Sequence, residues 1–284
     1  MVMTRSIGAA ALALCLTATG VLAAGPAIDI KRNKWTFGGV AGHYDRNQLQ
    51  RGFQIYREVC ASCHGLDRIA FRNLVEKGGP EFPKDAVEAL AKEYEVDDLP
   101  NQDGEVEKRP AKLSDNFPAL YANEQEARAI HNGAYPPDLS VIAKARGVAY
   151  VGPWYLHPWA MLKDIVNGYQ EGGADYLVAL LTGYKEPPAG KEIGDGMNYN
   201  AYYAGNQIAM ANPFSGGDGQ VEYQDGTPAT VENYAKDVSA FLSWAADPTL
   251  NSRKQIGWQV LIYLLITSIL LYIAKRRVWA SVKH

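Results

Sequence analysis

The sequence predicts a mainly α fold with long loops, followed by one C-terminal transmembrane helix. Two stretches far apart in the chain, residues 46–59 and 231–246, place apolar side chains at helical spacing. Between them glycine and proline are spread throughout and helical runs are short, which is typical of long loops. Residues 256–274 then form an apolar run without a charge, which is long enough to cross a bilayer.

The composition narrows the classes of function. The chain has 284 residues, of which 47% are hydrophobic and 21% charged, and its formal net charge is -3. This balance excludes a disordered chain, because such chains lack the apolar residues to build a core. It also excludes a basic nucleic-acid-binding protein, so we expect no nucleic-acid partner.

Residues 1–24 are typical of a secretory signal peptide, with Arg5 before an apolar stretch and small residues at its end. A permanent N-terminal anchor is the alternative, although the stretch is short and rich in alanine and threonine. Cleavage would remove Cys15 and leave Cys60 and Cys63 as the only thiols. An exported chain with this single pair has no disulfide framework to build.

The first amphipathic helix is expected to begin at Asp45, which with Gln48 resembles a capping box. Its apolar positions are Leu49, Phe53, Tyr56 and Val59. The helix leads directly into residues 60–64, so it would hold that segment against a core.

Residues 60–64 are Cys-Ala-Ser-Cys-His, the C-x-x-C-H pattern by which a c-type haem is attached. Two thiols at this spacing can reach both vinyl groups of one porphyrin, and the adjacent imidazole can become the proximal iron ligand. A thioredoxin-like pair or half of a zinc site are the alternatives. A zinc site would need two further ligands, and the sequence has no second cysteine pair and no H-x-x-x-H. The pattern predicts a cytochrome c-like domain with one covalent haem c, held by Cys60, Cys63 and His64.

The middle of the chain carries a strongly acidic segment. Residues 81–107 contain ten acidic side chains against two lysines. The segment is either a solvated insertion or a negative surface that steers a basic partner, and both interpretations stay open. Short helices are predicted at 85–94, 138–145 and 174–182.

The second axial position decides between an electron carrier and a site that binds small molecules. Beyond the leader and before the tail, the candidate ligands are Met161, Met197, Met210, His43, His131 and His157. Met210 is favoured because it lies in an irregular segment, where a loop can bend a thioether onto iron. A methionine on a packed helix more often fills the core.

The second amphipathic helix is predicted at 231–246, with Thr230 as its cap and Pro248 just beyond it. The membrane segment follows at 256–274 and has interfacial aromatic residues near both ends. Basic residues after this segment outnumber those before it, which places the C-terminus in the cytoplasm.

The expected organisation is a signal peptide at 1–24, a periplasmic haem domain at 25–250, and an anchor with a short cytoplasmic tail at 251–284. The chain would therefore be a single-pass protein of the bacterial inner membrane.

Several further motifs follow one another in the body and, in that order, are far more specific than any one alone. They are Gln50-Arg51-Gly52-Phe53-Gln54-Ile55-Tyr56, Pro137-Asp138-Leu139-Ser140, Ala143-Lys144-Ala145-Arg146, Asp175-Tyr176, Leu181-Thr182-Gly183-Tyr184, Ile208-Ala209-Met210 and Ala235-Lys236-Asp237-Val238. With them the chain resembles the cytochrome c1 family, the haem subunits of the cytochrome bc1 complex, or quinol:cytochrome c oxidoreductase.

The resemblance implies that His64 and Met210 are the axial ligands of the iron. It implies that Arg146 lies near a haem propionate with Tyr176 close by, and that Asn132 and Pro137 line the haem pocket. A guanidinium beside a propionate forms a charge-assisted pair. The alternative for Arg146 is a surface residue on a helix, and Tyr176 could equally be a core aromatic.

Three departures from the family pattern matter. The proline run that usually follows the ligand methionine is reduced here to one proline, Pro213. Residues 148–170, rich in aromatic side chains, look inserted and have no evident function. The extra cysteine pair of some bacterial relatives is absent, which removes a covalent link but no chemistry.

The function that the resemblance implies is electron transfer. The chain would carry electrons from a Rieske iron-sulfur protein to a soluble or membrane-tethered cytochrome c, beside cytochrome b. No catalytic residue is expected on this chain, because quinol oxidation belongs to the complex. The alternatives are a haem c subunit of another oxidase or dehydrogenase, and an open-site haem enzyme or sensor.

Overall fold

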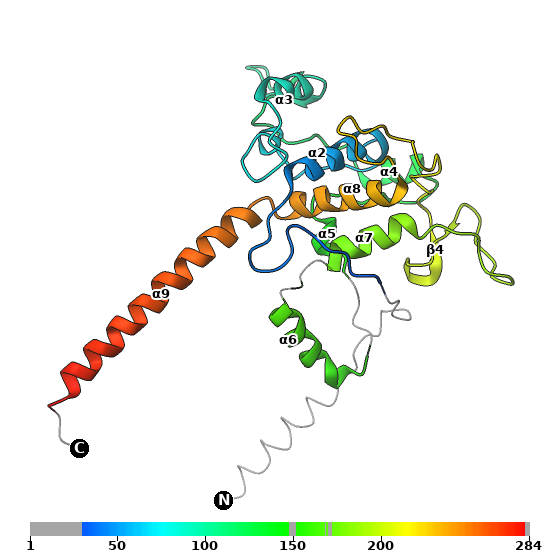
Figure 1. The fold of residues 1–284 in the computed structure, drawn as a ribbon. Helices are drawn as coiled ribbons and strands as arrows, with labels where there is room; N and C mark the ends of the chain where they lie inside the picture. Colours follow the sequence, from blue (N-terminus) through cyan, green and yellow to red (C-terminus); the bar gives the residue numbers. More distant parts are fainter. Residues whose placement is uncertain (1–29, 148–151, 168, 170–171, 282–284) are drawn as a thin grey trace, which may run out of the picture.

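Helices dominate the described part of the chain, and one long helix projects from the body (Figure 1). The computed structural model describes residues 30–147, 152–167, 169 and 172–281. The expected signal peptide and its Cys15 lie outside these residues. The fold is therefore mainly α with long loops, as the sequence predicts.

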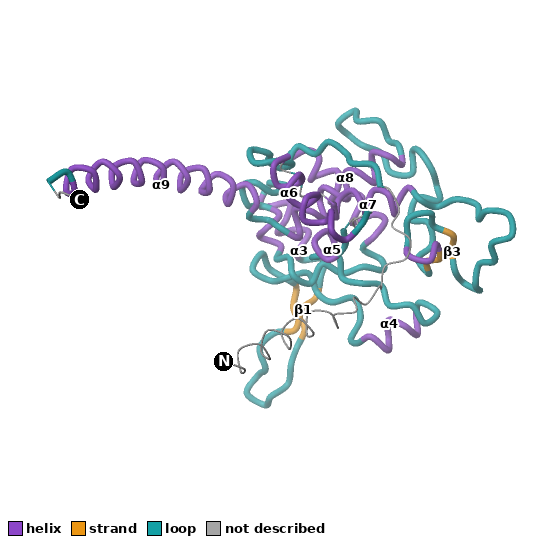
Figure 2. Tube along the Cα trace, turned by 90° about the horizontal axis from the view of Figure 1, so that it is seen from below, coloured by secondary structure: helices purple, strands orange, loops and turns teal. Residues whose placement is uncertain are grey.

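The elements follow one another as α2 (Arg46–Ile55), a π-helix (Tyr56–Cys60), a 3-10 turn (Phe71–Leu74), α3 (Lys84–Ala91), β1 (Glu95–Asp97), β2 (Lys108–Pro110), α4 (Glu124–Ile130), α5 (Ile142–Ala145), a 3-10 turn (Trp154–Leu156), α6 (His157–Asn167), α7 (Gly172–Thr182), β3 (Asn198–Tyr199), a 3-10 turn (Ala204–Asn206), β4 (Gln207–Ile208), α8 (Val231–Ala246) and α9 (Leu250–Trp279). The strands form two small antiparallel pairs, β1 with β2 and β3 with β4. Figure 2 shows how much of the body between the helices is loop.

Helix α8 is the centre of the core, and it packs against α2, α5 and α7. Its side chains Tyr234, Val238, Phe241 and Trp244 are almost fully buried. A Cβ at Gly52 of α2 would lie 2.1 Å from the carbonyl oxygen of Asp237, so only glycine allows α2 and α8 to cross this closely. The two predicted amphipathic helices are thus the packed pair on which the body is built.

The predicted helix starts are confirmed. The Asp45 side chain accepts a hydrogen bond from the Gln48 amide at 2.7 Å, and the Thr230 side chain accepts one from the Asn233 amide at 3.3 Å. Helix α8 has the bounds that the sequence predicts.

Three short helices differ in extent from their predictions. Helix α3 begins one residue before 85 and ends three before 94, and α7 begins two residues before 174. Only the last turn of 138–145 is helical, because the preceding residues bind another loop, as described below. Helices α4 and α6 were not expected from the sequence.

The long helix α9 is joined firmly to the body. Among the described residues it is the one helix long and apolar enough to cross a membrane. In its first turns, the Asn251 side chain accepts from the Tyr44 amide and donates to the Gly78 carbonyl, both at 3.1 Å. The Lys254 ammonium donates to the Phe37 carbonyl at 2.7 Å. Side chains in the first turns of α9 therefore bind the helix to the body, so the two are not joined by a flexible linker alone.

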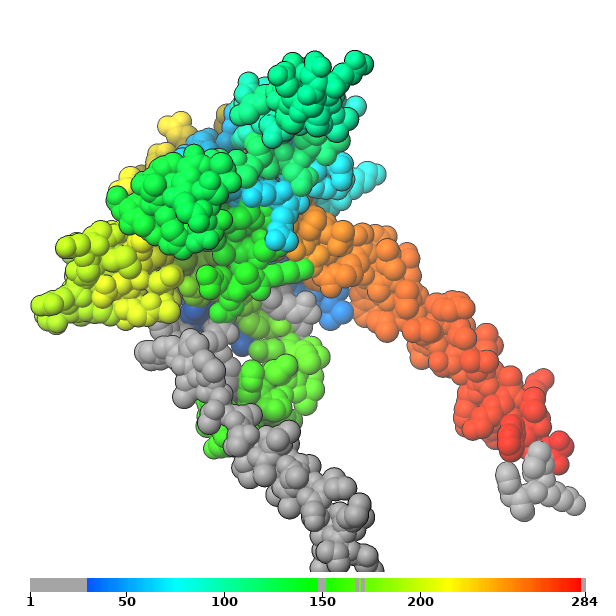
Figure 3. Space-filling view, turned by 180° about the vertical axis from the view of Figure 1, so that it is seen from behind, coloured from blue at the N-terminus to red at the C-terminus, as the bar shows by residue number. Residues whose placement is uncertain are grey.

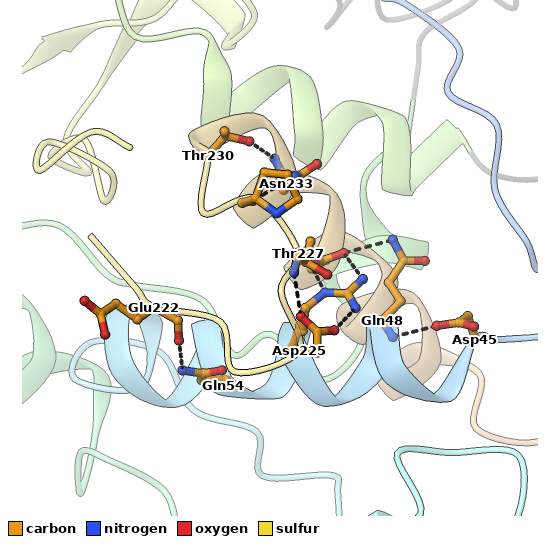
Figure 4. Close-up of polar contacts among 11 residues, drawn as sticks. Asp45, Gln48, Gln54, Glu222, Asp225, Thr227, Thr230 and Asn233 are labelled. Carbon is orange, nitrogen blue, oxygen red and sulfur yellow. Dashed lines mark hydrogen bonds and ion pairs between the residues drawn. The ribbon is translucent and has the colours of Figure 1, made fainter. Parts of the chain in front are cut away.

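A polar cluster joins α2 to α8 and to the loop before α8. Figure 4 shows Gln48 on α2 and Asp225 and Thr227 on the loop, close together. Arg51 donates from Nε to Asp237 and from Nη1 to Asp225, each at 2.7 Å, and Gln48 donates to Asp237 at 3.0 Å. Burial acts to lower the pKa of Arg51, but its bonds to the two carboxylates outweigh this and raise it. The guanidinium is thus a permanent charge within the core interface.

Asp225 gives this cluster a pH dependence. Hydrogen bonds from Thr227 and from Arg51 lower its pKa from 3.8 to about 2. Its contribution to stability is therefore full above about pH 4, the range of a free carboxyl, and is lost as the pH falls through 2. We expect Asp225→Asn to lower the Tm at pH 7 by roughly 1–3 °C, since the side chain is exposed. Thermal unfolding between pH 2 and pH 7 should show the difference disappear at the acid end, and a constant difference would contradict this account.

Candidate haem-attachment site

The attachment segment begins with a local change of helix type. After α2 the chain forms a π-helix over Tyr56–Cys60, in which the Ala61 amide donates to the Tyr56 carbonyl at 2.8 Å. π-Helical turns are rare and often mark functional sites. The chain then turns, and the amides of Cys63 and His64 both donate to the Cys60 carbonyl, at 3.1 and 3.0 Å. The π-helix thus ends at Cys60, and the turn that follows brings the backbone of Cys63 and His64 close to Cys60.

The His64 imidazole has one nitrogen fixed by the protein. Its Nδ1 lies 2.8 Å from the carbonyl oxygen of Pro137, which can only accept, so Nδ1 carries the proton. The Nε2 lone pair is then available for a metal. Burial lowers the pKa of His64 despite this hydrogen bond, which favours the neutral ring. The Tyr56 hydroxyl also donates to the His64 carbonyl at 2.9 Å, so side chain and backbone are both held.

The Pro137-Asp138-Leu139-Ser140 motif holds the loop that follows His64. The Leu139 amide donates to the Gly65 carbonyl at 2.9 Å. The Asp138 carboxylate accepts from the Asp67 amide at 2.9 Å, and the Ser140 hydroxyl accepts from the Arg68 amide at 3.1 Å. These bonds explain why the predicted helix at 138–145 is shortened.

A second pair of residues, which the sequence did not indicate as a unit, adjoins the motif. The Tyr121 hydroxyl lies 2.6 Å from His131 Nε2 and donates to the Cys63 carbonyl at 3.4 Å. The sequence offers His131 only as a candidate axial ligand, and in the structure its Nε2 is hydrogen-bonded to Tyr121. No sequence signal links these positions, since Tyr121 lies 58 residues from Cys63 in an irregular segment.

Cys60 and Cys63 are both free cysteines in the structure and form no disulfide with each other. Burial raises the pKa of Cys60 to about 12, so it is a neutral thiol at physiological pH. Reactive and zinc-binding cysteines need the thiolate. Within the described ranges, no three His, Cys, Asp or Glu side chains converge as a metal site. The two thiols, with the free imidazole nitrogen of His64, are the groups by which a C-x-x-C-H segment holds a haem.

Met210 lies just beyond β4, in an irregular and half-buried segment. Its carbonyl accepts from the Tyr184 hydroxyl at 3.1 Å and from the Asn198 side-chain amide at 3.4 Å. The β3–β4 pair and these two donors fix the backbone without using the thioether. This is what a ligand loop requires, and the sequence did not indicate either donor.

The remaining predicted residues lie at the edge of the body. Arg146 is exposed at the end of α5, and its charge partly offsets the burial that raises the pKa of Tyr176 on α7. A Cβ at Gly173 would lie 1.6 Å from a carbonyl of α5, so glycine allows this close approach. Asn132 is exposed and left-handed, with φ 52, and reverses the chain after α4. The structure thus brings Arg146 near Tyr176, and Pro137 near His64.

The helical body, the C-x-x-C-H loop with its fixed imidazole, and the apolar C-terminal helix define the class of this protein. It is a membrane-anchored haem protein of the electron-transport type. A family comparison gives the particular group: residues 35–282 match the Cytochrome C1 family, and the chain belongs to it.

The sequence is also similar to individual members of this group. It is 46% identical over 282 residues to "Cytochrome c1" of Blastochloris viridis, which covers 98% of this chain and 97% of that protein. It is 46% identical to "Cytochrome b/c1" of Bradyrhizobium diazoefficiens over 96% of this chain, but this chain spans only 40% of that protein's length. It is 42% identical to "Cytochrome c1, heme protein, mitochondrial" of Saccharomyces cerevisiae over 94% of this chain and 78% of that protein.

Proposed function

We propose that this chain binds one haem c covalently and carries electrons from a Rieske iron-sulfur protein to a c-type cytochrome within a quinol:cytochrome c oxidoreductase. Cys60 and Cys63 would hold the haem through thioethers, and His64 and Met210 would bind its iron. The observation that carries this proposal is the 2.8 Å contact between His64 Nδ1 and the Pro137 carbonyl, which leaves Nε2 for iron. When bound, the haem supplies reversible one-electron chemistry at its iron.

The chain's own residues prepare both axial positions. Pro137 orients the imidazole, and Tyr184 with Asn198 holds the Met210 backbone. A methionine ligand raises the potential relative to a second histidine. Arg146 supplies a positive charge for a propionate, with Tyr176 beside it. With His64 and Met210 both bound to the iron, the site would transfer electrons and would neither make nor break a substrate bond.

The domain organisation follows from the same proposal. Residues 1–24 are a signal peptide, 25–250 the periplasmic haem domain, and 251–284 the anchor and cytoplasmic tail. The basic residues after the apolar run support this orientation in a bacterial inner membrane. The relative named "Cytochrome b/c1" supports a position beside cytochrome b. The accepting cytochrome is soluble or tethered to the membrane.

The test begins with the full chain purified from membranes. A pyridine haemochrome assay should give one haem per chain that survives denaturing electrophoresis, and the Cys60→Ala/Cys63→Ala variant should lose it. The reduced protein should have a sharp low-spin spectrum and resist carbon monoxide. A blank assay would refute haem binding, and rapid carbon monoxide binding would point to an open-site enzyme or sensor.

Electron transfer is tested in the assembled complex. A tag on the chain should recover cytochrome b and a Rieske protein from membranes. In that complex, quinol should reduce this haem before an added c-type cytochrome is reduced. Recovery with an oxidase or a dehydrogenase instead would favour the alternative subunit role.

Tyr184→Phe should loosen the loop that carries Met210. The variant loses one hydrogen bond of about 1 kcal/mol, so the population with Met210 dissociated should rise about fivefold. The affinity of the oxidised protein for added imidazole, measured by absorption, should rise by the same factor. Tyr155→Phe, at an exposed tyrosine of the 3-10 turn Trp154–Leu156, serves as the control. An equal affinity in both variants would show that the hydroxyl does not hold the ligand loop.

A further inference from the structure

Within residues 148–170, the described part of the chain carries a dense group of exposed large apolar side chains. Side chains of the 3-10 turn Trp154–Leu156 and of α6 are open to solvent, with exposed fractions of 85% at Trp154 and 72% at Ile165. We name this set the α6 apolar face: Trp154, Tyr155, Leu156, Trp159, Met161, Leu162, Ile165 and Val166. Monomeric soluble proteins rarely leave so many large apolar side chains together in water.

The face points away from the body because the other side of α6 is bound to it. Ala160 and Asp164 are the partly buried positions of the helix. Arg32 donates to the Asp164 carboxylate at 3.0 Å, and its guanidinium lies 3.9 Å from the centre of the Tyr169 ring. At about 100° per residue, the apolar side chains of α6 cover an arc of roughly 160° opposite that contact. The helix is thus held by its polar side with its apolar side outward.

The position of α6 relates this face to the membrane helix. In Figure 1, α6 lies below the core, on the side toward which α9 leaves the body, and is separated from α9. Figure 3 shows the same arrangement from behind, with α6 and α9 both extending from the same side of the body. The apolar part of α9 begins within two turns of its start at Leu250. A bilayer that covers α9 therefore comes to the level of α6.

We propose that α6 is a membrane-interface helix, whose apolar face inserts into the headgroup and acyl boundary of the bilayer beside α9. The composition of the face supports lipid as its occupant. Two tryptophans and one tyrosine lie among aliphatic side chains, as in helices and belts at membrane interfaces. Asp164 is paired with Arg32, which leaves Lys163 as the one unpaired lysine, arginine or acidic residue in the sequence of α6, so the insertion is driven mainly by apolar contact. The proposal depends on the membrane helix and not on the haem.

Spin labels on the full chain test this directly. The chain, with any subunits that copurify, is placed in nanodiscs of phosphatidylcholine after Ile165→Cys labelling, and in parallel after Lys163→Cys labelling. The two positions differ by about 200° around the helix, so one label lies on the apolar face and the other does not. Relaxation by oxygen, which concentrates in lipid, is compared with relaxation by a water-soluble nickel chelate.

The ratio of oxygen to nickel relaxation should be at least fivefold higher at position 165 than at 163. Labelling of the unsubstituted chain measures any background from Cys60 and Cys63. Equal nickel access at both positions would place the face in water and overturn the proposal. Exclusion of both reagents at 165 would mean that protein covers the face, a neighbouring subunit or a second copy, and would overturn it as well.

Discussion

Met210→Leu is expected to lower the reduction potential of the bound haem by an amount on the order of hundreds of millivolts. Axial ligands set haem potentials over a range of about 0.8 V, and a thioether favours the reduced iron. Leucine keeps the volume of methionine but cannot donate to iron. The Met210 carbonyl would still accept from Tyr184, so the loop should keep its path.

A redox titration of the purified chain measures this change, and carbon monoxide should now bind the reduced protein. Met197→Leu is the matched control, because Met197 lies just before β3, the strand that pairs with β4 near Met210. Its potential should equal that of the unsubstituted chain. An unchanged potential in Met210→Leu would assign the ligand elsewhere, to Met161 or His157. Met161 is a weak alternative, since it lies on the exposed α6 apolar face.

Asp237→Ala is expected to cost about 3 kcal/mol of the free energy of unfolding. The Asp237 side chain is only 4% exposed and accepts from Arg51 and Gln48, so its loss removes the carboxylate that binds the Arg51 Nε in the interface between α2 and α8. Breaking a buried ion pair usually costs about 3–5 kcal/mol. The lower end of that range applies here, because Arg51 keeps Asp225 as a partner and keeps some contact with water. Urea unfolding followed by circular dichroism measures the change.

The same helix supplies the control for this prediction. Glu232 pairs with Lys236 one turn along α8 at 2.8 Å, and its side chain is 60% exposed. Glu232→Ala should cost no more than about 0.5 kcal/mol, as exposed helical pairs do. Equal losses in Asp237→Ala and Glu232→Ala would contradict the role given to the buried carboxylate. Replacing Arg51 and Asp237 together by apolar residues should recover much of the loss.

The sequence predicts the parts of this fold that depend on local chemistry. The caps Asp45 and Thr230 and the apolar spacing of α2 and α8 are local signals, and both helices form where they are expected. The C-x-x-C-H run is also local, so the three residues of the attachment loop could be named from spacing alone. The apolar run of α9 can likewise be recognised from the sequence alone.

The parts that could not be predicted depend on contacts between distant segments. Pro137 orients His64 across 73 residues of chain, and Tyr184 reaches the Met210 carbonyl across 26. No periodicity encodes such contacts. Helix α6 escaped prediction because proline and aromatic residues at its start resemble a loop, while its apolar side chains do not enter the core from which helices are usually recognised.

The attachment of α9 to the body has a consequence for electron transfer. Side chains at its first turns bind backbone groups of the body near Tyr44, Gly78 and Phe37. A domain joined to its membrane helix in this way cannot rotate about a flexible linker. Its redox centre would therefore stay at a constant distance from the bilayer surface and in a constant orientation. An electron donor and an electron acceptor would then have to come to this domain, because the domain itself would not move toward them.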